Sequence, residues 1–480
     1  MKLGMLKIFF NQILLNLKNS KRPFFKHNNE IYSYKYAYLN LLKINNYLYK
    51  FRNKKIILFS DKSLGYYISV LAIFLSGNTW IQISPNIPLV KIKQIIKFSN
   101  TKLAIYDESF NNKKILNLKN IKIISLSEIY NSKKLKNFSN FKKIKGKDIS
   151  CIFFTSGSSG EPKGVPLSYN NVISCANHQI DNLNYKKNQT FADCHDTSFV
   201  MSLVVIFPSI FLNCSISPLI SFLDKMDPIT YFNNNKIDNL ITVPSFILFN
   251  KDKISNLKIK NLILCGESFT SKIMNLLLKN SKASNIYNCY GATELSPWAF
   301  SYKLKTKDIN LIRKFGRVPI GKPFDKINYK FNELNELIIS GQVVAKEYLN
   351  NPQETLKKFK KFKNTYSYNT GDIGFKKDNL VFIKGRNDTQ VKIKGYRVDL
   401  AEIENISRSM KNNIFTFCFM DKGRLVLIYN NDKGNQTQRL YNFLKNKLPS
   451  YMVPNKIIFI KKIPFNKNGK VDRVKLKTIV

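Results

Sequence analysis

The chain has 480 residues, of which 44% are hydrophobic. This is enough for about two to four domains with apolar cores, and it excludes a low-complexity or collagen-like protein. The formal charge of +47 would attract nucleic acid, anionic lipid or acidic proteins. Lysine, asparagine and isoleucine are abundant along the whole chain, so we interpret the charge as compositional drift and predict no dedicated nucleic-acid surface.

The N-terminal 24 residues are interrupted by polar side chains, which does not fit a signal peptide. Their apolar residues have helical spacing and predict an amphipathic helix packed on the body: Ile8, Phe9, Ile13, Leu14 and Leu17. No run of about eighteen apolar residues occurs, so no membrane span is expected. Seven scattered cysteines without a C-x-x-C pair, and only three histidines, argue against a disulfide framework and a zinc site. A reducing compartment, the cytoplasm, fits this usage best.

Short apolar runs alternate with helix-like stretches in the first half of the chain. Strands are predicted at residues 54–60, 79–84 and 102–107, with a helix at 65–78. This β-α-β rhythm indicates a parallel sheet covered by helices. From about Asp388 the pattern restarts as a small α/β unit, so the sequence predicts an α/β protein with a second, smaller domain.

A loop rich in glycine and serine follows a predicted strand at residues 150–155. It reads SGSSGEPKGVPLS, Ser156 to Ser168, and we expect it to lead into a helix. Glycines let backbone N–H groups turn toward a ligand and hydroxyls add donors, so the loop suits phosphate. It is not a P-loop, because no Gly-Lys-Ser/Thr sequence closes it. Taken alone, it fits a flexible connector equally well.

Six further motifs follow in order along the chain. They are NCYGATELSPW (288–298), ELIISGQVVAKEYLNNP (336–352), YNTGDIG (368–374), KGRNDTQVKIKGYRVDLAEIE (384–404), LPSYMVP (448–454) and NKNGKVDR (466–473). With these motifs the chain resembles the ATP-dependent, AMP-forming adenylating superfamily: acyl-CoA synthetases, adenylation domains of nonribosomal peptide synthetases, and D-alanine–carrier-protein ligases. The resemblance extends over nearly the whole chain.

The resemblance implies a two-domain fold and a two-step reaction. A large N-terminal domain of parallel or mixed sheets with flanking helices, residues 1–387, would be joined by a hinge at Asp388 to a small mobile C-terminal α/β domain, residues 388–480. A carboxylate attacks the α-phosphate of ATP to give an acyl-adenylate and pyrophosphate, and a thiol then takes the acyl group. Both steps depend on positioning and on neutralising phosphate charge.

The resemblance also assigns residues to ATP and Mg²⁺. The phosphate loop would comprise Thr155, Ser156, Gly157, Ser158, Ser159, Gly160, Lys163 and Gly164. The other nucleotide contacts would be Tyr290 stacked on adenine, Asn288 at its edge, Gly291 in the same motif, Thr293 at the α-phosphate, Asp372 on both ribose hydroxyls, and Arg386 near ribose and phosphates. Glu294 would hold Mg²⁺, a cation that prefers oxygen ligands. Lys470 matches the adenylation lysine, which bridges the substrate carboxylate and the α-phosphate; Arg397 joins Lys470, Thr293 and Glu294 as a catalytic residue.

The activated acid is less well specified. Amino-acid-activating members carry a Phe-Asp pair whose aspartate binds the substrate ammonium, and this chain has His195-Asp196 there. A carboxylate at a buried pocket is costly unless it meets a cation, so Asp196 is a candidate anchor. The alternative is that Asp196 caps a helix beginning at Ser198. Phe246 and Gly266 match segments that line the acyl pocket.

The thiol acceptor is left open by the residues. No phosphopantetheine attachment motif occurs, so we expect a separate carrier protein or CoA to supply the thiol. Carrier proteins are typically acidic, and a basic enzyme would attract one. The leading hypothesis is an amino-acid adenylating ligase that loads a carrier protein. A fatty- or aryl-acid–CoA ligase is the rival, and an inactive basic module that binds nucleic acid or membrane is the alternative of another class.

Overall fold

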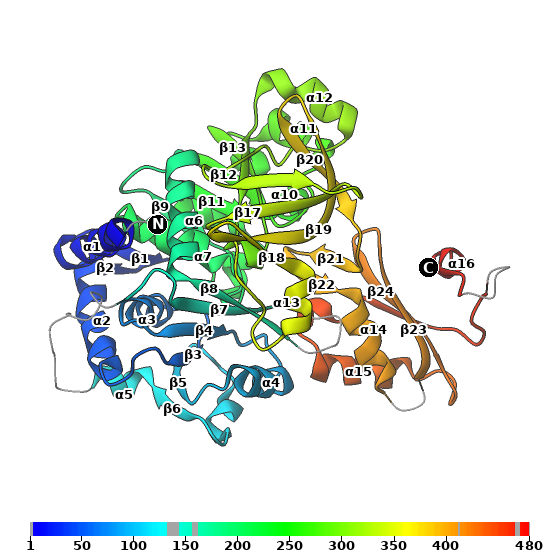
Figure 1. Ribbon diagram of the computed structural model, residues 1–480, viewed down its shortest axis with the longest axis horizontal. Helices are drawn as coiled ribbons and strands as arrows, with labels where there is room; N and C mark the ends of the chain where they lie inside the picture. The colour runs from blue at the N-terminus through cyan, green and yellow to red at the C-terminus, as the bar shows by residue number, and fades with distance from the viewer. Residues whose placement is uncertain (1–2, 132–143, 156–161, 411–412, 466–470, 480) are drawn as a thin grey trace. The chain divides into compact units, whose positions relative to one another are not determined.

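The structure is a computed structural model that describes residues 3–131, 144–155, 162–410, 413–465 and 471–479 (Figure 1). The chain forms two compact units. The large unit comprises Met1–Pro85, Ile96–Phe154 and Gly164–Asn387, and the small unit comprises Asn86–Ile95, Thr155–Lys163 and Asp388–Val480.

A nine-stranded sheet forms the centre of the large unit (Figure 1). Its strands, in spatial order, are β15 (Lys322–Pro323), β14 (Phe300–Lys303), β13 (Asn285–Tyr290), β12 (Asn261–Cys265), β11 (Asn239–Thr242), β9 (Thr190–Asp193), β10 (Ser215–Pro218), β1 (Pro23–His27) and β2 (Glu30–Ser33). The six strands from β13 to β1 are parallel, and the outer strands are antiparallel. Most apolar side chains of the inner strands are buried, as expected for a sheet covered on both faces.

A six-stranded sheet contains the predicted β-α-β region. Its order is β6 (Lys122–Ser125), β5 (Leu103–Tyr106), β3 (Lys55–Phe59), β4 (Thr79–Ile83), β7 (Ile149–Thr155) and β8 (Lys163–Ser168). The strands predicted at residues 54–60, 79–84 and 102–107 are confirmed, as is the helix between the first two, α3 (Leu64–Leu75).

The prediction that the glycine- and serine-rich loop leads into a helix is wrong. The loop joins β7 to its neighbour β8, and the next helix, α6, begins only at Tyr169. Ser168 caps that helix in a reciprocal capping box with Asn171. Lysine, glycine and proline in β8 give the sequence a loop-like composition, although the strand is largely buried.

A third, antiparallel sheet completes the strands of the large unit. It is formed by β16 (Asn328–Phe331), β17 (Glu336–Gly341), β19 (Thr365–Lys377), β18 (Phe359–Phe362) and β20 (Leu380–Arg386), with β20 paired to β19. The β19–β20 pairing sets Asp372 opposite Arg386. This register brings together two residues that the sequence assigns to ribose.

The small unit has its own sheets, helices and apolar core. Its strands are β21 (Gln390–Ile393) with β22 (Tyr396–Asp399), and β23 (Asn413–Asp421), β24 (Arg424–Asn431) and β25 (Lys456–Phe459) in a second sheet. Its helices are α14 (Leu400–Arg408), α15 (Thr437–Lys447) and α16 (Arg473–Lys477). The predicted α/β class with a second, smaller α/β element is confirmed.

The remaining helices are α1 (Leu3–Asn19), α2 (Tyr34–Leu48), α4 (Leu89–Ser99), α5 (Leu126–Tyr130), α7 (Ser202–Phe211), α8 (Phe222–Met226), α9 (Pro228–Asn234), α10 (Pro244–Phe249), α11 (Ser271–Asn280), α12 (Ile309–Phe315) and α13 (Pro352–Lys358). The predicted N-terminal helix is α1, which contacts α2, α6 and α7. Phe9 stacks on Phe211 with ring centroids 5.1 Å apart. One predicted core residue is exposed: Ile8 faces away from the body.

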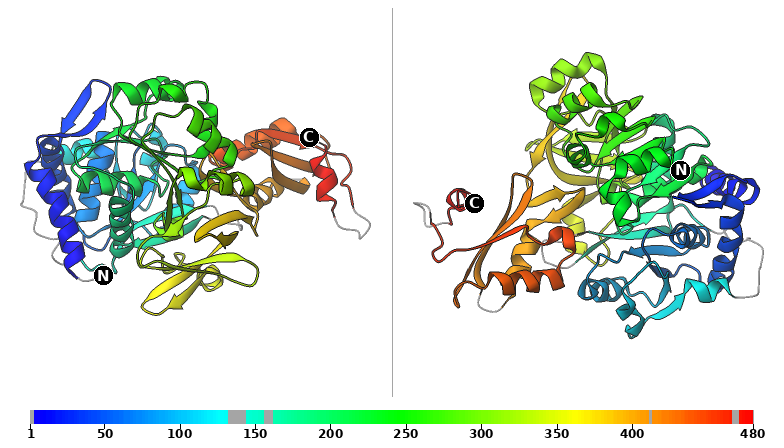
Figure 2. Two further views of the ribbon diagram at one scale, coloured as in Figure 1. Left: turned by 90° about the horizontal axis from the view of Figure 1, so that it is seen from above. Right: turned by 180° about the vertical axis from the view of Figure 1, so that it is seen from behind.

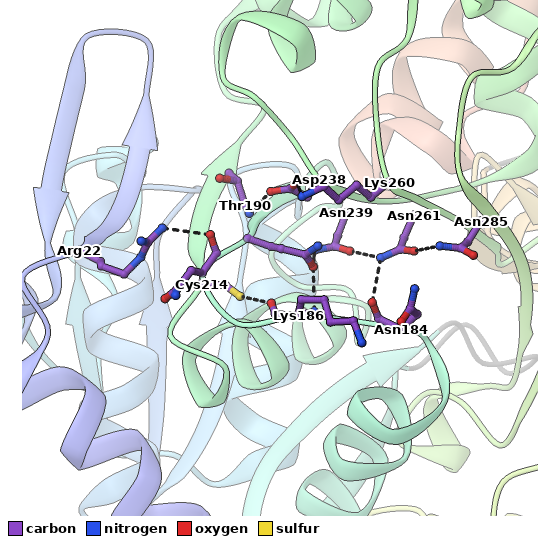
Figure 3. Close-up of polar contacts among 12 residues, drawn as sticks. Arg22, Asn184, Lys186, Thr190, Cys214, Asp238, Asn239, Lys260, Asn261 and Asn285 are labelled. Carbon is purple, nitrogen blue, oxygen red and sulfur yellow. Dashed lines mark hydrogen bonds and ion pairs between the residues drawn. The ribbon is translucent and has the colours of Figure 1, made fainter.

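A ladder of amide side chains crosses the amino ends of the parallel strands (Figure 3). Asn239, Asn261 and Asn285 occupy the first positions of β11, β12 and β13 and are in register with one another. Asn285 Nδ2 donates to Asn261 Oδ1 at 2.8 Å, and Asn261 Nδ2 donates to Asn239 Oδ1 at 2.6 Å. Asn239 Nδ2 donates to Gln189 Oε1 at 3.0 Å, before β9. The ladder therefore satisfies buried polar groups on four neighbouring strands.

Candidate active site

Four predicted site residues of the large unit lie at, or shortly after, the carboxyl ends of neighbouring parallel strands. Tyr290 ends β13, Gly266 directly follows β12, and Phe246 lies in α10 after β11. Asp196 follows β9, the next strand of the sheet. Ligands of open α/β sheets bind outside the carboxyl ends of the strands. The structure therefore brings these residues to one edge of the sheet.

The chain reverses tightly after Tyr290, and Gly291 makes the reversal possible. A Cβ at Gly291 would lie 2.0 Å from the carbonyl oxygen of Pro297. The following residues, Thr293–Leu295, form a single 3₁₀ turn. Motif 288–298 begins in a strand, because Asn288 and Tyr290 belong to β13. A strand holds these two side chains more rigidly than a loop would.

Asp372 is the centre of a buried hydrogen-bonded group. Its Oδ2 accepts from the Tyr290 hydroxyl in a short hydrogen bond, and its Oδ1 accepts from Arg386 Nη1 at 2.7 Å. Arg386 Nη2 also donates to the Thr370 carbonyl at 3.1 Å. Burial, with the adjacent Asp372 carboxylate, raises the pKa of Tyr290 well above its usual range, so the phenol stays a neutral donor. A carboxylate has about four acceptor positions, so this one can also accept from ligand hydroxyls.

Glu294 is buried in the 3₁₀ turn and is held by a distant residue. Its Oε1 accepts from the Tyr348 hydroxyl at 2.6 Å, and its carbonyl oxygen accepts from the Ala345 N–H at 2.8 Å. Thr293 beside it is also buried. Ser296 Oγ also donates to the Val343 carbonyl at 2.6 Å, so motif 336–352 supports motif 288–298 through these three hydrogen bonds.

Asn288 has a fixed side-chain amide. Its Nδ2 donates to the carbonyl oxygens of Pro319 at 2.9 Å and Val318 at 3.4 Å. This arrangement leaves Oδ1 as the atom of the amide suited to accept from a ligand amino group.

Asp196 lies in a turn between β9 and α7. Its Oδ1 accepts from the Ser198 N–H at 2.9 Å and hydroxyl at 2.5 Å, and its Oδ2 accepts from Ser84 Oγ at 3.1 Å. The alternative that Asp196 caps a helix beginning at Ser198 is wrong, because α7 begins at Ser202. The N-cap pattern is instead used for an Asx turn, in which the same side-chain-to-backbone bond closes a short reversal.

Asp193, three residues earlier, is the more deeply buried carboxylate. Its Oδ2 accepts from the Tyr67 hydroxyl at 2.7 Å, and its Oδ1 accepts from the His195 N–H at 3.2 Å. Lys62, also buried, donates to its carbonyl oxygen at 3.4 Å. Burial raises the pKa of Asp193, and the Lys62 ammonium opposes that shift. Sequence reasoning missed Lys62 and Tyr67; their position just after a predicted strand was the available signal.

Phe246 and Gly266 are joined through the loop after β12. Gly266 has a φ of 80°, which turns the chain directly after the strand. The next residue, Glu267, accepts from the Ser245 N–H at 2.9 Å and so ties this loop to α10. The Phe246 ring lies 6.1 Å from that of Phe232.

A protein family described as "AMP-binding enzyme" matches residues 16–349, which is more than half of the chain. The chain belongs to this family. The superfamily predicted from the sequence is confirmed, and with it the prediction of an ATP-using enzyme.

Curated relatives of this AMP-binding enzyme are similar over most of their length. The "D-alanine--D-alanyl carrier protein ligase" of Listeria monocytogenes serotype 4a (strain HCC23) is 28% identical over 459 residues, which cover 89% of each chain. The protein of the same name from Staphylococcus aureus (strain Newman) is 27% identical over 463 residues, 89% of this chain and 90% of the relative.

Solved structures share the fold at lower identity. The Vibrio cholerae adenylation domain AlmE, in complex with glycyl-adenosine-5'-phosphate, has a TM-score of 0.86 and 19% identity, covering 98% of this chain and 97% of that one. The o-succinylbenzoate CoA synthetase (MenE) of Bacillus subtilis has a TM-score of 0.83 and 16% identity, covering 98% of each chain. At these identities the likeness shows the fold alone.

The small unit of this AMP-binding enzyme carries the other predicted residues. Thr155 Oγ1 donates to the Lys163 carbonyl at 3.5 Å. Asp388 Oδ1 accepts from the Gln390 N–H at 3.2 Å, and Arg397 Nε donates to Gln390 Oε1 at 2.6 Å. The remaining predicted loop residues and the adenylation lysine lie outside the described residues: Ser156, Gly157, Ser158, Ser159, Gly160 and Lys470. Gly164, in the large unit, accepts from the Leu349 N–H at 2.8 Å.

The donor set fits a nucleotide with a phosphate-bound cation better than a resident metal. No group of three or more His, Cys, Asp or Glu side chains could hold a metal within the described parts of the chain. Mg²⁺ is commonly bound by one or two carboxylates together with substrate phosphates, so the single buried carboxylate of Glu294 is compatible with it. In the same described ranges, no helix is both long and apolar enough to cross a bilayer.

Proposed function

We propose that this enzyme activates a small amino acid with ATP and loads it onto the phosphopantetheine thiol of a separate carrier protein. The observation that carries the proposal is the similarity to curated D-alanine--D-alanyl carrier protein ligases across 89% of both chains. In this proposal the Asp196 carboxylate, which accepts hydrogen bonds from Ser84 and Ser198, would also bind the ammonium of the amino-acid substrate.

In the first half-reaction, a carboxylate oxygen of the amino acid bonds to the α-phosphorus, and the bond from that phosphorus to pyrophosphate breaks. Asp372 accepts from the ribose hydroxyls, while Tyr290 and Arg386 hold its carboxylate in place. Thr293 donates to an oxygen of the α-phosphate. Glu294 would hold the Mg²⁺ that neutralises charge on the phosphates. Most of the catalytic effect then comes from positioning and from fixed charges.

In the second half-reaction, the thiol sulfur of the carrier bonds to the activated carbonyl carbon and AMP leaves with the oxygen. We propose that the small domain, residues 388–480, turns about Asp388 between the two steps, as a hinge that assembles each site in turn. Lys470 would then act in the first step only.

An exchange assay tests the substrate class. ATP–pyrophosphate exchange is measured with D-alanine, L-alanine, glycine, bulkier amino acids, fatty acids and aryl acids. We expect exchange with a small amino acid and none with acids that lack an ammonium. Exchange with fatty or aryl acids alone would overturn the amino-acid assignment. Transfer of the labelled acid to a phosphopantetheinylated carrier protein, with CoA as the competing acceptor, tests the second step.

Lys470→Ala tests the proposed division of labour. We expect adenylate formation to fall by about 10²–10³-fold, because a cation at the developing negative charge is removed. Thioester formation from synthetic aminoacyl-adenylate should stay within about twofold of the unmodified enzyme, measured as carrier loading in single turnover. Equal loss in both assays would contradict the assignment.

A further inference from the structure

The N-terminal segment is basic and almost free of acidic residues. Residues 1–60 contain twelve lysines and arginines and one acidic residue, Glu30, whereas the whole chain contains 78 and 31. The ratio is twelve to one in this segment against about 2.5 to one overall. Acidic residues are scarce in this segment, so the positive charge of its lysines and arginines is little offset.

Helix α1 is apolar on two opposite faces. The face turned to the body is buried and consists of Leu6, Phe9, Phe10, Ile13 and Leu17. Met5, Ile8 and Leu15 lie on the opposite face at helical spacing, and Ile8 is 65% exposed. Lys7 and Lys18 are also exposed. A helix that is apolar all round is normally buried on both sides. The exposed face of α1 has no apolar surface packed against it among the described residues.

The hairpin and helix that follow expose further apolar side chains. Ile31 in β2 is 60% exposed, and Tyr36 and Leu39 in α2 are also exposed. The Tyr32 and Tyr36 rings lie 5.1 Å apart. With these aromatics, a shallow cavity of about 250 Å³ is lined by Lys21, Pro23, Ile31, Tyr32, Ser33 and Tyr36. A lysine at the rim of an aromatic and aliphatic hollow is suited to a molecule with an anionic head and an apolar chain.

These features form one region, because α1, β1, β2 and α2 lie side by side at one edge of the large unit in every view (Figures 1 and 2). We define the N-terminal surface as Met5, Ile8, Leu15, Ile31, Tyr36 and Leu39. These six are among 21 exposed large apolar side chains in the described chain, although they come from only its first 39 residues. The clustering is what distinguishes them from the scattered apolar residues of an ordinary surface.

We propose that the N-terminal surface binds anionic lipid bilayers, with the exposed face of α1 and the Ile31–Tyr36 hollow in the headgroup region and the surrounding lysines on the lipid phosphates. Nucleic acid would use the lysines but would gain little from exposed Met, Ile and Leu side chains. A bilayer uses both, because apolar burial and attraction to anionic lipids act together at its interface. Binding would place the enzyme on a membrane without a spanning helix.

Sedimentation with vesicles tests the apolar contribution. The full-length enzyme is mixed with vesicles of phosphatidylcholine alone or with phosphatidylglycerol added. We expect binding only to the anionic vesicles. The variant Ile8→Ser/Leu15→Ser/Ile31→Ser/Tyr36→Ser should bind them at least about tenfold more weakly. The matched control Phe249→Ser/Leu278→Ser/Leu334→Ser/Leu356→Ser removes four exposed apolar side chains elsewhere and should bind as the unmodified enzyme does.

Charge reversal separates a specific surface from the overall positive charge. Lys18→Glu, Lys21→Glu and Lys35→Glu together should weaken binding at least about tenfold, and Lys279→Glu, Lys330→Glu and Lys376→Glu should change it less than about threefold. Equal effects of the two triple variants would overturn the proposal. Unchanged vesicle binding of the serine variant would also overturn it. So would a lysine triple variant that binds RNA or an acidic protein more weakly while its vesicle binding is unchanged. Unchanged ATP–pyrophosphate exchange and circular dichroism confirm that each variant is folded.

Discussion

Polar side chains at the two ends of the nine-stranded sheet find their hydrogen-bond partners in different ways. At the amino ends, Asn239, Asn261 and Asn285 satisfy one another across neighbouring strands (Figure 3). At the carboxyl ends, polar side chains are satisfied by residues far along the chain: Tyr290 by Asp372, and Glu294 by Tyr348. At the amino end the partners come from neighbouring strands of the same sheet, whereas at the carboxyl end they come from several motifs.

This difference separates stability from function. A closed ladder of neutral amides offers a ligand no charge and stabilises the strands it joins. The carboxyl end holds buried carboxylates and the buried Lys62, with Arg386 partly buried beside Asp372. Paired charges of this kind stabilise a fold little and are typical of sites that bind charged ligands. Substitutions at the two ends should therefore affect different measurements.

Asp372→Asn should have the largest effect on activity. The amide keeps the shape of the side chain but loses the charge that pairs with Arg386 and one of the two acceptor oxygens. We expect kcat/KM for ATP in pyrophosphate exchange to fall by about 10²–10³-fold. Asp378→Asn, in the turn of the same β19–β20 hairpin, is the control because its side chain is exposed. Equal activity of the two variants would remove Asp372 from the site.

Asn261→Ala should reverse this pattern. The substitution removes the partner of the buried Asn239 Oδ1 and of the partly buried Asn285 Nδ2. We expect the free energy of unfolding in urea to fall by about 2–3 kcal/mol. The kcat/KM of the folded enzyme should stay within about twofold. Asn310→Ala, at an exposed position of α12, should change stability by less than about 0.5 kcal/mol. If Asn261→Ala lost activity without losing stability, the assignment of the amino ends to stability and the carboxyl ends to function would be wrong.

Much of the carboxyl end could be predicted from the sequence. Buried apolar runs fix the parallel strands, and the residues after them are then expected at one edge. The sequence predicts Tyr290, Glu294, Asp372 and Arg386 as site residues, but it does not predict the hydrogen bonds from Tyr348 to Glu294 and from Tyr290 to Asp372. These bonds span 54 and 82 residues and depend on how the strands and loops are arranged in space. Sequence periodicity sets which face a side chain takes, and it does not set the register between strands.

Two errors have local causes. Residues 163–168 contain lysine, glycine and proline and so have the composition of a loop, although the structure buries them as β8. Asp196-Thr-Ser has the pattern of a helix N-cap, yet it closes a turn before α7. The asparagine ladder has a recognisable pattern in the sequence: an asparagine precedes an apolar run at 239, 261 and again at 285. Equivalent residues at the starts of adjacent parallel strands are neighbours in space.

His195 should make the carboxyl end sensitive to acid. Burial is the main cause that lowers its pKa to about 3, and the nearby Lys62 ammonium adds to the shift; its ring nitrogens are buried without a hydrogen-bond partner among the described residues. The unfolded chain binds a proton near pH 6.5, so this stabilising contribution is present above pH 6.5 and is lost as the pH falls toward 3. Between pH 7.5 and 5.5 the stability of the enzyme should fall by roughly 1 kcal/mol relative to His195→Phe. The stability difference caused by Asn261→Ala should not change over that range, because the ladder contains no titratable group.

Tyr290→Phe should produce the smallest effect and the most specific one. The variant keeps the ring against Phe300 and removes only the hydroxyl that donates to Asp372. The loss of one buried hydrogen bond should lower stability by about 1 kcal/mol and raise the KM for ATP about five- to tenfold, with kcat nearly unchanged. Tyr302→Phe on the neighbouring strand β14 removes a hydroxyl that donates to Asp308, outside the site. It should cost similar stability and leave the KM for ATP unchanged. If both variants raised the KM for ATP alike, the cause would be a general loss of sheet stability. Tyr290 would then have no specific role in orienting the Asp372 carboxylate.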